Sequence, residues 1–138
     1  MFNDRSSILS LLETRRSGRP RDLVAPGPSA EELDRILAIA SRTPDHGKLH
    51  PWRFVHVPAD RRGAFAELLE RAYRADNPDP GRLEIEAAHR FAHQAPELIV
   101  VLSCPLPEHK IPVWEQELSC GAAAMNLLLA AHAMGYAG

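Results

Sequence analysis

The chain has 138 residues, of which 45% are hydrophobic and 25% are charged, and its formal net charge is -2. This length fits one globular domain, and the composition excludes an acidic disordered chain and a protein that coats nucleic acid through a large positive charge. The charge is uneven, because residues 1–62 hold 11 Lys and Arg against 8 Asp and Glu, whereas residues 63–138 hold 5 against 10. The positive charge therefore lies toward the N-terminal end.

Cysteine content and hydropathy predict a cytoplasmic protein. The two cysteines, Cys104 and Cys120, form no CxxC pair, and no signal peptide is found at the start of the chain, so we expect no disulfide framework and a reducing compartment. The longest apolar run, near residues 118–131, is interrupted by Ser119 and Asn126 and is shorter than the roughly 20 residues of a spanning helix. We expect no membrane segment.

The first 24 residues predict a short helix followed by a basic loop. Residues 6–14 place several leucines and an isoleucine on one helical face. Four arginines then fall within residues 15–21, beside Gly18 and Pro20. Two interpretations of these arginines compete, namely a solvated loop without a partner, or a cluster that binds a phosphate through bidentate contacts. The residues alone favour the solvated loop.

A turn-rich linker at residues 25–28 leads into a second predicted helix, which begins at a Ser29 and Glu32 capping box and ends near Arg42. The following segment, residues 43–54, is polar and contains two prolines. Pro44 and Pro51 disfavour helix at the residues before them, and Gly47 permits unusual dihedral angles. We therefore expect an irregular backbone, anchored to a strand at residues 54–57, that forms the wall of a ligand site.

The second half of the chain predicts three helices and one strand. Asp60 is expected to cap a third helix, which ends at residues 77–81, and a fourth helix covers residues 82–93. The apolar run at residues 98–102 predicts a central strand that is covered on both faces. Two strands make only a hairpin-sized sheet, which is too small for five helices to cover. We therefore expect that further, C-terminal strands of the domain are missing from this chain.

The longest predicted helix covers residues 113–134 and is closed by Gly135. It is apolar almost all round, which indicates that it is buried. A partner subunit is the favoured cover, and an internal position in the core is the alternative.

Four motifs follow one another along the chain, namely Arg15-Arg16-Ser17 with Arg19, Arg42-Thr43-Pro44-Asp45-His46, His50-Pro51-Trp52-Arg53-Phe54 and Trp114-Glu115-Gln116-Glu117. In this order they resemble the FMN-dependent NAD(P)H nitroreductases, particularly their short single-domain bacterial members. The resemblance implies an α+β fold in which helices wrap an antiparallel sheet. It also implies that residues 1–138 form a single FMN-binding domain, and that a homodimer with the long helix at its interface binds FMN there.

The resemblance also implies site residues. It places Arg15, Arg16 and Ser17 on the FMN phosphate and ribityl chain, which reverses the preference for a solvated loop. Arg42 and His46 match positions that contact the flavin, shared across the dimer. Further candidates for FMN contacts are Arg19, Lys48 and His50, of which His50 replaces the amide of the commoner Asn-x-Gln-Pro-Trp pattern. Residues Ala130, Ala131, His132, Ala133, Met134 and Gly135 resemble a segment linked with NAD(P) binding, although the same residues also read as a helix end.

The implied reaction is a ping-pong hydride transfer from NADH or NADPH, through FMN, to an electron-poor acceptor such as a nitroaromatic or a quinone. It needs no protein nucleophile, and the residues offer no convincing catalytic constellation for one. One alternative is a flavin-binding or interaction module without turnover. A second is a metal-binding protein that uses Glu86, His89 and His93 on one helical face, although a solvated face explains these residues more simply because the HExxH signature is missing.

Overall fold

Residues 2–138, which the computed structural model describes, form five α-helices, two β-strands and three short 3₁₀ turns. In chain order these are α1 (Ile8–Thr14), η1 (Pro20–Asp22), α2 (Ala30–Ala40), η2 (His46–Lys48), β1 (Trp52–His56), η3 (Ala59–Arg61), α3 (Arg62–Asp76), α4 (Arg82–Ala92), β2 (Ile99–Ser103) and α5 (Val113–Ala133). The mixed α+β class expected from the sequence is confirmed. In the described part of the chain, no helix has both the length and the apolar character that crossing a membrane requires.

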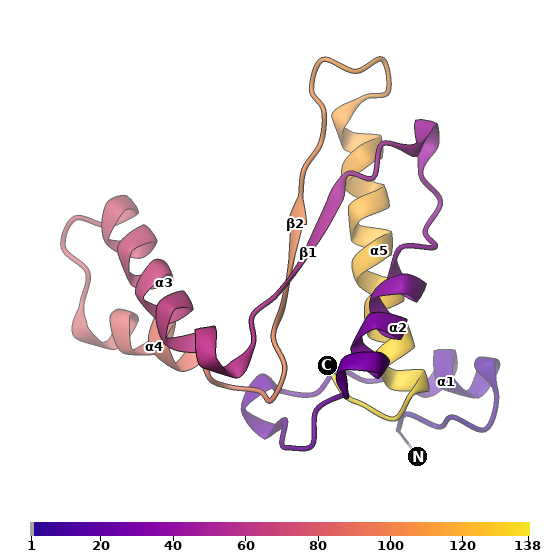
Figure 1. Cartoon of the computed structure of the whole chain (residues 1–138), viewed down its shortest axis with the longest axis horizontal. Helices are drawn as coiled ribbons and strands as arrows, with labels where there is room; N and C mark the ends of the chain where they lie inside the picture. The colour runs from indigo at the N-terminus through magenta and orange to yellow at the C-terminus, as the bar shows by residue number, and fades with distance from the viewer. Residues whose placement is uncertain (1) are drawn as a thin grey trace.

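The two strands form an antiparallel pair that packs against α5 (Figure 1). Alternate residues of β1 face the helix, so Trp52 is buried and Phe54, opposite Val101 of β2, is partly buried. Trp52 forms the core of this layer with Cys120 and Ala123 of α5. A tryptophan removes about 150 to 250 Å² from water when it is buried. This packing fixes β1 and the segment before it on α5.

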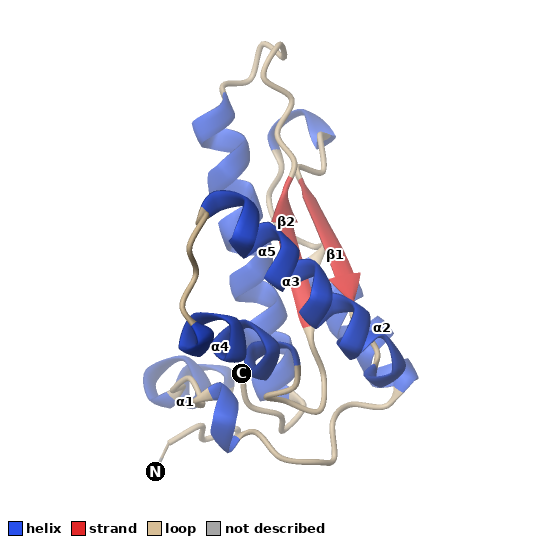
Figure 2. Cartoon of the chain, turned by 90° about the vertical axis from the view of Figure 1, so that its left-hand side faces the viewer, coloured by secondary structure: helices blue, strands red, loops and turns tan. Residues whose placement is uncertain are grey.

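Helix α2 packs on α5 and begins as the sequence predicts. The Ser29 hydroxyl accepts a hydrogen bond from the Glu32 amide, and the Glu32 carboxylate accepts one from the Ser29 amide, which completes the capping box. Its buried face includes Ile36 and Ala40. Helices α3 and α4 pair with one another on the other side of the strands, as Figure 2 shows from that side.

The structure corrects two of the expected elements. Strand β2 is not a central, doubly covered strand, because β1 is its only pairing partner in the described residues and Leu102 is 44% exposed. Asp60 does not cap α3, because it lies inside the preceding 3₁₀ turn, which Pro58 initiates, and the N-cap residue is Arg61 without a side-chain bond. A proline that starts a tight turn thus moved the helix start beyond the acidic residue.

The structure also shows that the apolar faces of α1 and α5 are only partly covered. Ile8 and Leu9 of α1 are 80% and 70% exposed, and only Leu11 of that helix is buried. On α5, Trp114 and Leu118 are largely exposed. The described residues leave these apolar side chains open to solvent, near the C-terminal end of α5 in the case of α1 and near its start in the case of Trp114 and Leu118.

A buried arginine joins the end of β1 to the end of α4. The Arg62 side chain donates to three backbone carbonyls, those of Val57 at 2.6 Å, Ala92 at 2.8 Å and Pro96 at 3.1 Å, and the residue is only 4% exposed. Neutral carbonyls therefore replace the water around this guanidinium, and no carboxylate among the described residues forms an ion pair with it. Sequence reasoning gave no sign of this residue's role.

We expect the substitution Arg62→Ala to lower the free energy of unfolding by about 3 kcal/mol, because it removes hydrogen bonds from a charged donor and leaves buried carbonyls unpaired. The free energy of unfolding of Arg62→Lys should lie between those of Arg62→Ala and the unsubstituted chain, since one ammonium cannot reach three divergent carbonyls. Urea denaturation gives both values. The exposed neighbour Arg61 provides the control, and Arg61→Ala should change the free energy by less than about 0.5 kcal/mol. Equal losses at the two positions would contradict the role given to Arg62.

Candidate functional site

The segment between α2 and β1 has a backbone that most residues avoid. Gly47, Lys48 and His50 have φ angles of 79°, 54° and 48°. At Gly47 an added Cβ atom would lie 2.6 Å from the Ile111 Cδ1 atom, so a side chain there would be strained in its dihedral angle and would displace the end of Ile111. Lys48 and His50 adopt the left-handed region at a cost of about 1 kcal/mol or more each. Strain of this kind persists where surrounding contacts impose it, and it is found most often at functional sites.

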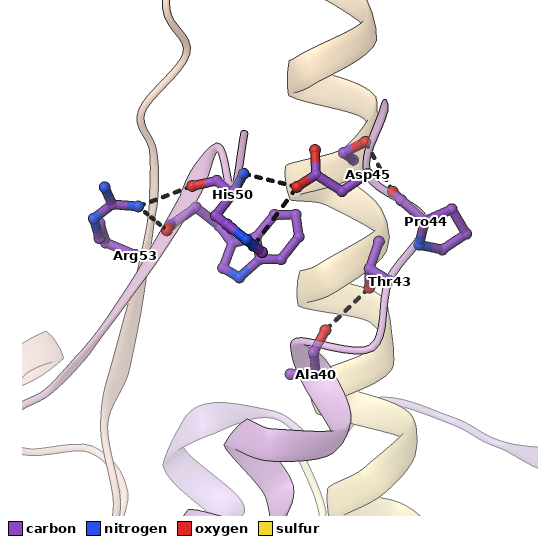
Figure 3. A network of polar contacts seen from close by, with 8 residues as sticks. Ala40, Thr43, Pro44, Asp45, His50 and Arg53 are labelled. Atoms are coloured by element: carbon purple, nitrogen blue, oxygen red, sulfur yellow. Dashed lines mark hydrogen bonds and ion pairs between the residues drawn. The ribbon is translucent and has the colours of Figure 1, made fainter. Parts of the chain in front are cut away.

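Hydrogen bonds around Asp45 and His50 supply such contacts (Figure 3). The Asp45 carboxylate accepts from the His50 amide at 2.7 Å and lies 3.6 Å from the His50 Nδ1 atom. The Arg53 guanidinium donates to the carbonyls of His50 and Trp52 at 2.8 and 2.7 Å. The exposed His50 ring also meets the Trp52 ring edge-on, with centroids 5.8 Å apart. The irregular backbone expected from the sequence is therefore confirmed, and its turn is closed from within.

Helix α5 holds the same segment from outside. The Ser119 hydroxyl donates to the Pro44 carbonyl at 3.0 Å, and the Asn126 side-chain amide donates to the Thr43 hydroxyl at 2.8 Å. Near the start of α5, Glu115 Oε1 lies 2.6 Å from His46 Nδ1. These three helix residues are separated by four and seven positions, so they lie along one face of α5. The segment runs antiparallel to that face.

The basic loop lies near the other end of α5. Arg15 caps α1 and donates to the Ser17 hydroxyl at 3.2 Å, and the Gly18 amide donates to the Gly138 carbonyl at 2.9 Å. The Arg16 guanidinium lies 5.7 Å from the centre of the Phe2 ring. Among residues 2–138, no carboxylate forms an ion pair with Arg15, Arg16 or Arg19. These arginines and the hydroxyl are thus available to an anion.

The segment predicted for NAD(P) is the C-terminal end of α5. Gly135 has a φ angle of 98° and donates to the His132 carbonyl, while the Tyr136 amide donates to the Ala131 carbonyl, which closes the helix. Ala130 and His132 are buried, whereas Ala133 and Gly135 are exposed. Some of these residues line a hollow of about 580 Å³ between α1, α2 and α5, namely Ala130, Ala133 and Met134.

The structure thus gathers the predicted site residues into two groups. Arg15, Arg16, Ser17 and Arg19 lie with residues 130–135, whereas His46, Lys48 and His50 lie near the start of α5. Arg42, which is exposed, follows Ser41, the C-cap of α2, and its neighbour Thr43 contacts Asn126 between Glu115 and His132 of α5. The distance from Glu115 to His132 along the helix is about 25 Å, from a rise of about 1.5 Å per residue.

Comparison with known proteins shows the family of this chain. The family model described as "Nitroreductase family" matches residues 12–138. The chain is 42% identical over 129 residues to a Haemophilus influenzae protein named "Putative NAD(P)H nitroreductase", covering 93% of this chain and 68% of that one. It is 37% identical over 130 residues to the Escherichia coli K12 protein "Putative NAD(P)H nitroreductase YdjA", covering 94% and 69%. The chain belongs to the nitroreductase family.

A solved structure supports the fold assignment. A nitroreductase-like family protein from Bacillus cereus superposes with a TM-score of 0.69 at 22% identity, over 91% of this chain. The match covers 64% of the Bacillus protein, so this chain spans less than two thirds of its length. At this identity the likeness establishes the nitroreductase-like α+β fold and nothing finer.

Sequence reasoning assigned no role to several residues that shape the candidate site. Asp45 and Glu115 occur in the sequence motifs without an assigned role, and Ser119 and Asn126 appear there only as interruptions of an apolar run. In the structure all four shape or hold the segment. A signal did exist, because Glu115, Ser119 and Asn126 are polar and their spacing places them on one face of the helix. By contrast, no group of three metal-binding side chains exists in residues 2–138. Glu86 pairs with Arg82 and His89 with Glu70, which leaves the metal alternative without support.

His132 is the one titratable group in the predicted NAD(P) segment. It is 1% exposed, and neither ring nitrogen has a hydrogen-bond partner among the described residues. Burial, and then the nearby Arg15 guanidinium, lower the pKa of His132 below its ordinary value. The native state therefore holds the neutral ring. The unfolded chain takes up the proton first as pH falls, so this contribution to stability is complete above about pH 6.5 and is lost below it.

We expect His132→Leu to make stability less dependent on acid, because the substitution removes the buried group that must stay neutral. Between about pH 7.5 and pH 5, the free energy of unfolding should fall less for the variant than for the unsubstituted chain. Urea denaturation at several pH values measures this difference. His93, which is exposed, serves as the control, and His93→Leu should keep the original pH dependence. The interpretation is wrong if His132→Leu retains it too.

Proposed function

We propose that this chain is an FMN-dependent oxidoreductase that takes hydride from NADH or NADPH and passes it to an electron-poor acceptor such as a nitroaromatic or a quinone. Family membership supports an oxidoreductase, and the names of the two relatives suggest NAD(P)H as the donor. The observation that carries the proposal is the group of arginines without a carboxylate partner beside a hydroxyl, because these donors suit a phosphate.

The basic loop would hold the phosphate end of FMN. Arg15 and Arg16 supply charge, and Ser17 already accepts a hydrogen bond from Arg15, so its own proton is free for a phosphate oxygen. Arg19 is exposed on the same loop and is a further candidate. The loop is fixed at both ends, by the α1 cap and by the bond between Gly18 and Gly138. A fixed loop binds an anion with less loss of conformational entropy than a mobile one.

The segment that α5 holds would form the flavin end. Arg42 and His46 are exposed there and can offer hydrogen bonds to the ring system, with Lys48 and His50 as further candidates. Bound FMN would supply the carrier, which accepts hydride from the nicotinamide and passes it on to the acceptor in a ping-pong sequence. The chain's own residues would bind and orient the cofactor. Residues 130–135 remain the proposed nicotinamide segment, through their less buried members Ala131, Ala133, Met134 and Gly135.

The separation of the two groups supports a homodimer. His46 and the basic loop lie near opposite ends of α5, about 25 Å apart along the helix, which exceeds the reach of one FMN molecule. If two copies pair with their α5 helices antiparallel, the basic loop of one copy approaches His46 of the other. The two-fold symmetry of such a dimer then produces two equivalent sites.

The exposed apolar side chains offer a surface for this pairing. Trp114, Leu118 and Met125 are spaced by four and seven positions, so they lie on one face of α5. Ile8, Leu9 and Leu12 of α1 are also exposed. Large exposed apolar surfaces on folded proteins commonly mark interaction sites. A second copy would cover them by the isologous contact that two-fold symmetry requires.

The rival function, a flavin-binding module without turnover, predicts different spectra. Under the proposal, the purified protein is yellow with flavin absorbance, NAD(P)H bleaches it, and a nitroaromatic or quinone restores the colour. A yellow protein that NAD(P)H does not bleach supports the module instead. A colourless protein that gains no absorbance when FMN is added contradicts both.

Replacing the arginines tests the phosphate contact. We expect Arg15→Ala or Arg16→Ala to weaken FMN retention, because each removes a charge-assisted hydrogen bond that contributes about 1.5 to 3 kcal/mol. Flavin absorbance after desalting, and FMN titration, give the change. Arg21→Ala is the matched control, because Arg21 is exposed on the same loop and lies 4.0 Å from its neighbour Asp22. Unchanged FMN affinity in both variants would refute the phosphate assignment.

Mixing two defective chains tests whether the site is shared. One chain carries Arg15→Ala and Arg16→Ala, and the other carries Arg42→Ala and His46→Ala. Each alone should lose FMN, whereas an equal mixture that exchanges subunits should recover about one quarter of the original sites, because half of the dimers are mixed and each has one intact site. A site built within one chain gives no recovery in the mixture.

A further inference from the structure

The contact between Glu115 and His46 can do more than tether a loop, because it involves the imidazole ring itself. Glu115 Oε1 and His46 Nδ1 lie 2.6 Å apart, although the residues are 69 positions apart in sequence. The Glu115 side chain is 32% exposed, and that of His46 is 67% exposed. The Glu115 carboxylate is therefore partly shielded from solvent at the surface of α5, whereas most of the His46 ring is open to solvent.

The geometry fixes where the imidazole proton resides. An ionised carboxylate only accepts hydrogen bonds, so His46 Nδ1 must carry the hydrogen that the contact requires. Glu115 lies in the first turn of α5, where the helix dipole favours a negative charge. The hydrogen bond that one ring nitrogen makes selects the state of the other. His46 Nε2 is consequently the ring nitrogen left for a bound molecule.

The backbone under His46 is also fixed by α5. Ser119 holds the Pro44 carbonyl and Asn126 holds the Thr43 hydroxyl, so the chain reaches His46 from an anchored position. Neither contact touches the imidazole, which could still rotate or change tautomer. Only Glu115, among the described residues, has a hydrogen bond to the His46 side chain. Orientation of the ring thus depends on this one carboxylate.

We infer that Glu115 is a positioning residue, which fixes the Nδ1-protonated form and the orientation of His46 so that Nε2 is presented to FMN. This inference rests on the proposed function, because it takes His46 to contact the flavin. It adds a residue that does not itself touch the cofactor. It also assigns one nitrogen of His46 to that contact.

Binding measurements test the inference on the whole chain. We expect Glu115→Ala to raise the Kd for FMN by about 3- to 30-fold, within the range over which contacting residues couple. His46→Ala should raise it at least as much, and the double variant should match His46→Ala within about 2-fold, because the carboxylate acts only through the ring. Glu117→Ala removes the same charge from an exposed position of α5 and should leave the Kd unchanged. Ser119→Ala loosens the backbone without touching the ring and should act less than Glu115→Ala.

A tautomer measurement gives a readout that loop tethering alone would not change. In 15N-labelled protein without FMN, at about pH 8 where a free histidine is neutral, long-range proton–nitrogen spectra should show His46 protonated at Nδ1. Glu115→Ala should shift His46 toward the Nε2-protonated form, while Ser119→Ala should not. An Nε2-protonated His46 in the unsubstituted chain would overturn the inference without any reference to FMN.

The outcomes separate this inference from the proposed function. If His46→Ala weakens FMN binding and Glu115→Ala does not, the inference is wrong and the proposed flavin site stands. If Ser119→Ala acts as strongly as Glu115→Ala and neither changes the tautomer, Glu115 only tethers the loop, which also overturns the inference. If neither His46→Ala nor Glu115→Ala changes FMN binding, both the inference and the flavin contact of His46 are wrong.

Discussion

The packing of α5 is the interaction on which the rest of this structure depends. One face of the helix buries Trp52 with Cys120 and Ala123, and so fixes the strands. Another face carries the polar residues that hold the segment before β1. Because the sheet has only two strands among the described residues, it is marginal without this support. The helix is therefore both the core element of the fold and the frame of the candidate site.

The strained turn at residues 47–50 is stable because its surroundings impose it. Lys48 and His50 occupy the left-handed region, which costs free energy in any L-residue with a side chain. The Asp45 carboxylate and the Arg53 guanidinium hold the turn through the His50 amide and carbonyl, and α5 holds the segment that precedes it. Hydrogen bonds and packing around the turn thus offset its strain and keep the exposed side chains of Lys48 and His50 in a defined arrangement. Such preorganisation lowers the entropy lost when a ligand binds.

Sequence reasoning succeeded where local chemistry decides the structure, and it failed where distant contacts decide it. The α2 capping box, the glycine that ends α5 and the irregular segment at residues 43–54 all follow from neighbouring residues, and the α+β class followed from the family motifs. The coverage of β2 and the role of Arg62 depend on residues that are far away in sequence, such as Ala92 and Pro96 for Arg62, so no local pattern reveals them. To predict which residues contact the polar face of α5, one must know how that face is aligned with the segment before β1, and only the fold supplies this alignment.

Under the proposed dimer, cofactor binding and subunit association are linked. Each FMN would contact the basic loop of one copy and His46 of the other, so the free energy of FMN binding would also hold the two copies together. The exposed apolar faces of α1 and α5 would then be covered by the same event that completes the sites. Under this proposal, the open apolar side chains and the divided site residues would be two consequences of one arrangement. A chain that built its whole site alone would have no need of either.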